Sequence, residues 1–112
     1  MNKDRRMTVK EFLETIKNLE ATLYQIQITN RFKKSLELSY SRNLDLILLK
    51  NVIHTLAKGE QLDIKHRAHT LLGYQTVIWE CHIKPDWLLL WQQIEDELIL
   101  ILLDTGSHSD LF

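Results

Sequence analysis

The residues of this chain with the clearest chemical capacity are histidines that gather in its second half. His66, His69, His82 and His108 all follow residue 60, and Asp86 comes four residues after His82. An imidazole exchanges a proton near neutral pH, so two histidines can supply both a general base and a general acid. The chain turns after the strand pattern that ends before Asp86, and this turn would aim the carboxylate back toward His82. These residues predict an acid–base site on one face of the C-terminal half.

Each of these residues also has a structural explanation. A lone histidine on a small domain is usually solvated, which is the alternative for His66, and Asp86 alone suits a turn after Pro85. The spacing of His66 and His69 could suggest a metal site, yet neither a predicted helix nor paired cysteines accompany it. A small metal-binding domain that uses the histidine cluster stays an alternative, although we expect no resident metal or cofactor.

The elements that must position these residues begin with an amphipathic helix. Thr8 stands three residues before Glu11, which is a capping-box pattern, and apolar residues recur at helical spacing from Val9 to Leu19. This pattern predicts a helix from about residue 8 to residue 20. The segment "LYQIQIT" then alternates apolar and polar residues, which predicts a half-buried strand that ends at the helix cap Thr29.

Two further helices are predicted between residues 29 and 58. In "RFKKSLELSYSR", Phe32 and Leu36 belong to an apolar stripe, while the lysines face water. The next helix, "LILLKNVIHTLAKGE", begins at Asn43 or Asp45 and has Gly59 as its C-terminal stop. Its richer apolar content predicts that it is the more deeply buried of the two.

After residue 60 the spacing of the apolar residues changes to the alternation that is typical of strands. "VIWECHIKP" alternates, with Glu80, His82 and Lys84 on one face and Trp79 on the other. "WLLLWQQIED" and "ELILILLDTG" are apolar strand patterns joined at "EDE" by a hairpin turn. The sequence therefore predicts an α+β fold. Its antiparallel meander has one face covered by the two preceding helices and the other face open for a ligand.

Composition bounds the class of protein. The chain has 112 residues, of which 45% are hydrophobic and 26% are charged, so we expect one compact domain. A net charge of −1 argues against nucleic-acid affinity from phosphate contacts alone, although local basic patches occur. Cys81 has no cysteine partner, and the sequence shows no signal-peptide core and no apolar run of membrane-helix length. We therefore expect a cytoplasmic protein that does not enter a membrane.

Several segments together resemble a known family. "CHIKPDWLLL", a short hairpin, and the ending "TGSHSDLF" look like the C-terminal half of the YafQ branch of the RelE-type toxins, in the RelE/ParE superfamily. "HTLLG" and the helical segment from "RFKKSL" to "KGEQL" extend the likeness to about residues 23–112. These toxins are ribosome-dependent mRNA endonucleases of bacterial type II toxin–antitoxin systems. The resemblance implies a small, twisted, mainly antiparallel sheet of about four or five strands with two helices on one face.

The resemblance also implies an activity and its residues. In a metal-independent cleavage, an RNA 2′-OH attacks the adjacent phosphate and leaves a 2′,3′-cyclic phosphate, and cutting mRNA in this way inhibits translation. We expect His69 as base, His108 as acid and Phe112 as a platform for a nucleotide. His82 and Asp86 are expected to form a positioning pair. The residues expected to bind RNA are Lys65, Arg67, Glu80 and Lys84.

The expected partners are mRNA on the ribosome and a cognate antitoxin, in an arrangement such as a toxin–antitoxin heterotetramer. Two positions that are commonly arginine in the family hold Trp79 and Asp104 here. Strand alternation puts Trp79 in the helix-covered core, whereas a carboxylate at position 104 would repel a scissile phosphate. The alternative function is therefore an attenuated or inactive member of the family that only binds its antitoxin.

An N-terminal extension, residues 1–22, precedes the part that resembles a toxin domain, residues 23–112. The extension contains the amphipathic helix, whose apolar stripe needs a partner. The helix either packs on its own domain, or occupies the groove that an antitoxin helix would use, or makes a dimer contact.

Overall fold

The computed structural model describes residues 6–112, so residues 1–5 of the predicted extension lie outside the described part. The elements in chain order are α1 (Val9–Lys17), β1 (Gln25–Ile28), α2 (Asn30–Ser41), α3 (Leu46–Ala57), the short 3-10 helix η1 (Ile64–His66), β2 (His69–Thr70), β3 (Trp79–Lys84), β4 (Trp87–Ile94), β5 (Ile99–Gly106) and α4 (His108–Leu111). The predicted helices and strands are confirmed. The first helix is shorter than predicted, and η1, the two-residue β2 and the one-turn α4 are not among the predicted elements.

The helix ends follow the capping chemistry of the sequence. The Thr8 side chain accepts a hydrogen bond from the backbone N–H of Glu11, and the Glu11 carboxylate accepts one from the N–H of Thr8. Thr29 caps α2 in the same way, and Asp45 rather than Asn43 caps α3. The chain leaves α3 at Gly59, whose φ of +76° lies in the left-handed region that glycine adopts without strain.

Within residues 6–112 the strands form a five-stranded sheet in the order β1-β5-β4-β3-β2. The pairs β2–β3, β3–β4 and β4–β5 are antiparallel, which confirms the predicted meander. The strand β1 pairs in parallel with β5. Because α2, α3 and three strands separate β1 from β5 in the sequence, local patterns do not reveal this pairing.

Two β-bulges change which residues share a face. In β3 the register shifts between His82 and Lys84, next to the turn that carries Asp86. In β5 it shifts so that Leu90 pairs with Asp104 while Trp91 pairs with Leu102. A bulge bends its strand and re-aims the side chains beyond it. Both bulges lie at the end of the sheet where β3, β4 and the C-terminal tail meet.

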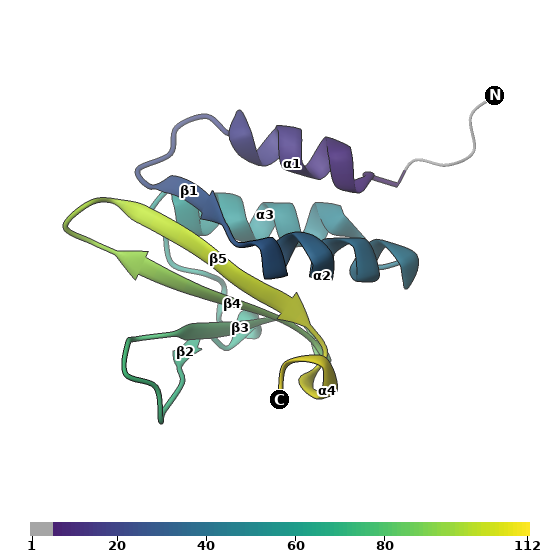
Figure 1. The fold of residues 1–112 in the computed structure, drawn as a ribbon. Helices are drawn as coiled ribbons and strands as arrows, with labels where there is room; N and C mark the ends of the chain where they lie inside the picture. Colours follow the sequence, from purple (N-terminus) through teal and green to yellow (C-terminus); the bar gives the residue numbers. More distant parts are fainter. Residues whose placement is uncertain (1–5) are drawn as a thin grey trace.

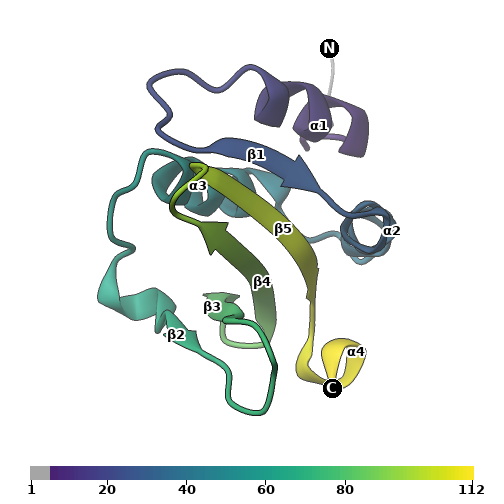
Figure 2. The ribbon, with the colours of Figure 1, turned by 60° about the vertical axis from the view of Figure 1, so that its left-hand side comes forward.

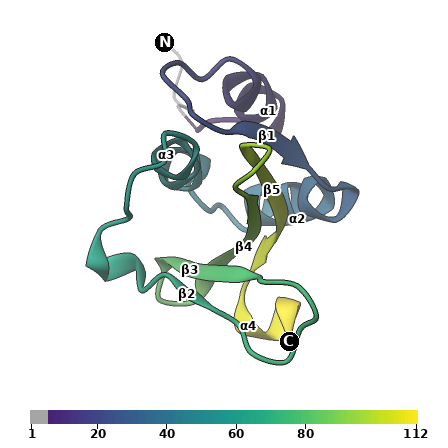
Figure 3. The same cartoon turned by 90° about the vertical axis from the view of Figure 1, so that its left-hand side faces the viewer.

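The core lies between the helices and one face of the sheet (Figure 1, Figure 2). Phe12 and Ile16 of α1 are buried in the same core as Phe32 of α2, and the rings of Phe12 and Phe32 are 6.3 Å apart. The helix α1 therefore packs on the rest of its own chain. All three ribbon views place α1 and the C-terminal α4 at opposite ends of the molecule, so α1 leaves the surface around α4 uncovered (Figure 1, Figure 2, Figure 3).

Candidate active site

The end of the sheet beside α4 gathers four of the five predicted catalytic residues. His82 comes from β3, Asp86 from the β3–β4 turn, and His108 and Phe112 from the tail. The ring centroid of His108 lies 6.0 Å from that of His82 and 6.4 Å from that of Phe112. Residues that are distant in the sequence thus form one continuous surface cluster of imidazole, carboxylate and aromatic groups.

His108 is held by Asp86. The Asp86 carboxylate oxygen Oδ1 accepts from the backbone N–H of His108 and lies 3.2 Å from its Nδ1. These contacts, the backbone hydrogen bond first and the side-chain hydrogen bond next, lower the pKa of Asp86 below the usual aspartate value. The carboxylate is therefore ionised at neutral pH, so Nδ1 carries the hydrogen and faces it. The predicted pairing of Asp86 with His82 is wrong, because the turn directs the carboxylate to the tail instead.

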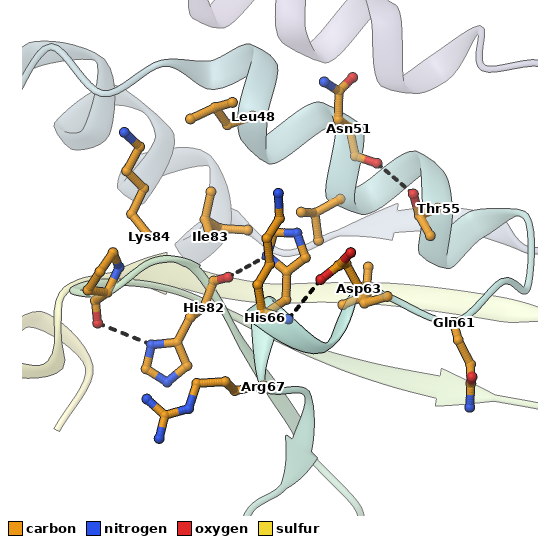
Figure 4. A pocket seen from close by; sticks show the side chains of 14 residues that line it. Leu48, Asn51, Thr55, Gln61, Asp63, His66, Arg67, His82, Ile83 and Lys84 are labelled. Carbon is orange, nitrogen blue, oxygen red and sulfur yellow. Dashed lines mark hydrogen bonds between the residues drawn. The ribbon is translucent and has the colours of Figure 1, made fainter.

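His82 has a different anchor. Its Nδ1 lies 3.1 Å from the backbone carbonyl of Pro85, and a carbonyl can only accept, so Nδ1 must donate. Within residues 6–112, no hydrogen bond engages the Nε2 of either His82 or His108. His66, for which we weighed a solvated role, donates from Nδ1 to the His82 carbonyl at 2.7 Å and so helps to fix β3 (Figure 4).

His69 lies on β2 beside Glu80 and is engaged at both ring nitrogens. Its Nδ1 donates to the Arg67 carbonyl at 2.7 Å, and its Nε2 lies 3.1 Å from Glu80 Oε1. The Glu80 side chain is only 6% exposed. Glu80 is predicted to bind RNA, but its side chain is buried, because β2 pairs alongside β3 and brings His69 directly opposite Glu80. A buried carboxylate needs such a partner, since unpaired burial of a charge is costly.

The basic residues predicted to bind RNA line a cleft of about 850 Å³ between α3 and the segment from η1 to β3. Lys65, Arg67 and Lys84 contribute to its walls, together with His66 and His82. Figure 4 shows these side chains around the cleft, whose residues come from α3, η1 and β3 and from the segments next to them. The cleft therefore connects a positively charged surface to the histidine cluster.

The tail that carries His108 is held in place by Asp110 and Arg42, whose contact the sequence patterns did not predict. Ser107 and Asp110 form a capping box around α4. Arg42, at the end of α2, donates to both carboxylate oxygens of Asp110, at 2.6 and 3.3 Å. These bonds, the one from Arg42 foremost, lower the pKa of Asp110 to about 2. Gly106 is required here, because a Cβ on it would come within 2.9 Å of the Asp110 Cβ.

The two positions where the sequence departs from the family have distinct surroundings. Trp79 packs against the core and stacks on Trp91 with ring centroids 6.0 Å apart, as strand alternation predicted. Asp104 is buried, and its Oδ1 accepts from the Ser35 hydroxyl at 2.5 Å and from the Thr105 N–H at 2.8 Å. Its Oδ2 lies 2.8 Å from the Nε of Arg31. The sequence offered no signal for this ion pair, because the i+3 and i+4 rules reach only along one helix.

The remaining reactive groups do not extend the cluster. Burial, with a smaller effect of the Glu80 charge, raises the pKa of the Cys81 thiol to about 12, so this cysteine is not a thiolate at neutral pH. Among residues 6–112, no three histidine, cysteine or acidic side chains converge as a metal-ligand set. In the same part of the chain, none of the helices has the length and apolar character that crossing a bilayer requires.

Fold and site define a small α+β protein with an exposed histidine–carboxylate cluster at one end of its sheet. The family model described as "Bacterial toxin of type II toxin-antitoxin system, YafQ" matches residues 24–112. The chain belongs to this YafQ family of bacterial toxins, and the predicted family and fold class are confirmed. The helix α1 lies outside the matched residues.

Individual relatives agree with this assignment. The "mRNA interferase toxin YafQ" of Escherichia coli strain K12 is 28% identical over 88 residues, covering 78% of this chain and 94% of the relative. The crystal structure of a metal-bound toxin from Helicobacter pylori has a TM-score of 0.76 and 38% identity, covering 80% of this chain and 99% of that one. YafQ in the E. coli DinJ-YafQ toxin-antitoxin complex has a TM-score of 0.75 and 25% identity, covering 80% and 98%.

Proposed function

We propose that this protein is an mRNA interferase, a ribosome-dependent endoribonuclease that inhibits translation in the cytoplasm. Membership of a toxin family and the similarity to an mRNA interferase toxin support the class of activity. The observation that carries the chemistry is the pair His82 and His108. Their rings are 6.0 Å apart, each Nδ1 is anchored, and each Nε2 is left for a substrate.

The reaction transfers one proton at each end of the scissile linkage. The Nε2 of His82, unprotonated because Nδ1 holds the hydrogen, takes the proton of the 2′-OH. The 2′ oxygen then forms a bond to the adjacent phosphorus, and the bond from phosphorus to the 5′ oxygen breaks. The Nε2 of His108, in its imidazolium form, donates the proton that the departing 5′ oxygen needs. The products are a 2′,3′-cyclic phosphate and a 5′-hydroxyl, and none of these steps requires a metal ion.

Asp86 and Phe112 support His108 in this scheme. The Asp86 carboxylate accepts from Nδ1 of His108, which orients the ring and leaves Nε2 for the substrate. Phe112 is 61% exposed and its ring borders that of His108, which suits it for stacking on a base next to the cleavage point. The role of base moves from His69 to His82, because both nitrogens of His69 are engaged within the protein.

The cations of the cleft supply the electrostatic part of RNA binding. Lys65, Arg67 and Lys84 line the cleft that leads to His82, and a strand of RNA in it would meet them through its phosphates. The alternative function, an inactive member of the family, depends on repulsion between the Asp104 carboxylate and the scissile phosphate. The Nε of Arg31 lies 2.8 Å from that carboxylate, and only 8% of the Asp104 side chain is exposed. The negative charge is therefore compensated within the protein, which weakens the case for an inactive family member.

The proposal includes a cognate antitoxin as partner, in a complex such as a heterotetramer. The similar E. coli toxin was solved as the DinJ-YafQ toxin-antitoxin complex. Residues 1–22 are proposed to be an extension of the toxin domain, 23–112, and α1 packs on that domain through Phe12 and Ile16. Expression of the chain should arrest growth, and co-expression of its antitoxin should restore it.

The decisive experiment removes the proposed acid. Ribosomes programmed with a defined mRNA are incubated with the wild type, with His108→Ala and with His54→Gln, a change in a histidine of α3 outside the cluster. We expect His108→Ala to lower the cleavage rate by about 10²- to 10⁴-fold while the melting temperature stays near that of the wild type. The fragments should end in a 2′,3′-cyclic phosphate. Undiminished cleavage by His108→Ala would overturn the proposal.

A further inference from the structure

A second concave surface lies beside the histidine cluster, on the open face of the sheet. This groove, of about 330 Å³, lies between the start of α2, the bulged part of β5 and the C-terminal residue. The groove is lined by the apolar Leu90 and Ile78 and by two exposed aromatic residues, Tyr74 and Phe112. These two residues are 51% and 61% exposed. The volume is at the small end of ligand sites, and the aromatic lining suits one flat ring.

Arg31 gives this groove a cation that is held in place. It lies in the first turn of α2, its side chain is 74% exposed, and its Nε lies 2.8 Å from the Oδ2 of Asp104. The other oxygen of Asp104 accepts from Ser35 and from the backbone N–H of Thr105. Within residues 6–112, no other hydrogen bond or ion pair engages the guanidinium. The buried carboxylate thus fixes one edge of Arg31 and leaves its two Nη groups for a ligand.

Arg42, at the end of the same helix, differs from Arg31 in the hydrogen bonds of its guanidinium. Arg42 donates to both oxygens of Asp110, at 2.6 and 3.3 Å, so its guanidinium is satisfied within the protein. Arg31 is held through Nε alone and lines the groove together with Phe112. An anchored guanidinium with two free donor groups matches the oxygens of a phosphate, which it can bind in a bidentate manner.

We propose that the groove binds the RNA nucleotide next to the scissile linkage, with its phosphate on Arg31 and its base against Phe112 and Tyr74. This inference rests on the proposed function. Continuity supports it, because Phe112 lines the groove and its ring lies 6.4 Å from that of His108. A strand whose reacting phosphate is at His108 therefore reaches the groove with the adjoining nucleotide. Asp104 is a positioning residue, which acts through Arg31.

The first test measures binding separately from chemistry. The full chain is titrated with a short single-stranded RNA in which every ribose is 2′-O-methylated, so that it binds without being cleaved. We expect Arg31→Gln to weaken binding about tenfold and to lower the slope of log affinity against log salt by about 0.7, the effect of one phosphate contact. Lys34→Gln, a change in an exposed lysine of the same helix, serves as the matched control. Equal affinities for Arg31→Gln and Lys34→Gln would overturn the proposal.

Asp104→Asn gives the sharper test, because the two possible roles of this carboxylate predict opposite changes in RNA affinity. If Asp104 only repels RNA, its neutralisation tightens binding. If it positions Arg31, its neutralisation frees the guanidinium and weakens binding severalfold, even though a negative charge has been removed. We expect the weaker binding, with the Arg31→Gln/Asp104→Asn double variant no weaker than Arg31→Gln alone. Tighter binding by Asp104→Asn would refute the positioning role and, with it, the subsite. The ¹H–¹⁵N spectrum of each variant checks that the fold is kept.

Cleavage kinetics separate this inference from the proposed function. On ribosome-bound mRNA, Arg31→Gln should raise KM about tenfold and leave kcat within about threefold of the wild type. If the wild type cleaves and Arg31→Gln matches it in KM, the subsite fails while the endoribonuclease stands. If the wild type does not cleave but Arg31→Gln still weakens RNA binding, the proposed function fails and the subsite stands. If Arg31→Gln keeps RNA affinity and loses only antitoxin affinity, the groove is a protein contact and the proposal is wrong.

Discussion

Two histidine–carboxylate pairs lie on the open face of this sheet, and they are built in opposite ways. In the pair His69–Glu80 the carboxylate is 6% exposed, and both imidazole nitrogens are engaged within the protein. In the pair His108–Asp86 the carboxylate is 73% exposed, and the imidazole keeps Nε2 for solvent or substrate. The residue types are almost the same, so the difference comes from burial and from the second partner of each ring.

The comparison shows how burial determines the role of each histidine–carboxylate pair. A buried carboxylate must be compensated, so His69 is tied to Glu80 and contributes mainly to the stability of the β2–β3 edge. An exposed carboxylate costs little, so Asp86 is available to orient His108 for proton transfer. His82 resembles His108 rather than His69, because a carbonyl fixes its Nδ1 and no bond within residues 6–112 occupies its Nε2. We therefore expect activity to follow His82 and His108, and stability to follow His69.

The largest expected effect is on cleavage by the second histidine of the reacting pair. His82→Gln removes the proposed base while an amide can still donate toward the Pro85 carbonyl. Cleavage of ribosome-bound mRNA should fall by about 10²- to 10⁴-fold, with the urea unfolding midpoint almost unchanged. The wild-type rate in His82→Gln, together with a large loss in His69→Gln, would reverse the comparison and return the role of base to His69.

An intermediate effect is expected on stability at the buried pair. His69→Ala leaves the Glu80 carboxylate buried without its imidazole, which should lower the free energy of unfolding by about 2–3 kcal/mol. The double variant His69→Ala/Glu80→Gln should recover part of this loss, because the uncompensated charge is removed as well. Urea unfolding followed by tryptophan fluorescence measures both. A loss of stability after Asp86→Asn as large as that after His69→Ala would contradict the distinction between the two pairs.

The smallest effect concerns the acid sensitivity of the tail that carries His108. The pKa of Asp110 is about 2 in the folded protein and about 3.9 in an unfolded chain. A lowered folded pKa means that the contribution of this carboxylate to stability is complete above pH of about 4 and is lost as the pH falls toward 2. The tail should therefore stay docked at pH 5 and be released below about pH 3.

Arg42→Gln provides the check on this acid sensitivity. Without the arginine the pKa of Asp110 should rise toward its usual value, so the release of the tail should shift upward toward pH 4. The methyl resonances of Leu111 and the ring resonances of Phe112 report the release in NMR spectra. An unchanged midpoint in Arg42→Gln would show that the capping box of Ser107 and Asp110 alone holds the tail.

Much of the fold could be predicted because its causes are local. Thr8 and Glu11 form the capping box that their spacing predicted, and Thr29 caps the next helix. Alternation along β3 correctly put Trp79 on the core face and His82 on the open face. Such patterns depend on the period of a helix or strand and on hydrogen bonds within one turn, so a short window of sequence contains them.

The partners within the site could not be predicted in the same way. The spacing predicts that Asp86 pairs with His82, four residues away, but the turn after Pro85 presents it to His108, which is 22 positions further along the chain. Glu80 is predicted to bind RNA, but it is buried, and its partner is His69 on the neighbouring strand β2. Two partners of Asp104, Arg31 and Ser35, come from α2, and the Ser35 hydroxyl is 69 positions away. Each of these depends on a bulge, a turn or the crossing of two elements rather than on spacing.

Residue types and their spacing indicate the family, the helices and strands, and the set of groups able to carry out acid–base chemistry. Residue type and local period are sufficient for these, since propensity, capping and amphipathicity act over a few residues. The three-dimensional fold is needed to show which histidine keeps a free nitrogen, which carboxylate is buried, and that Arg31 is anchored at a groove beside Phe112. These outcomes depend on strand register and burial. The neighbours that the fold places around a side chain determine its charge state and the groups that it can contact.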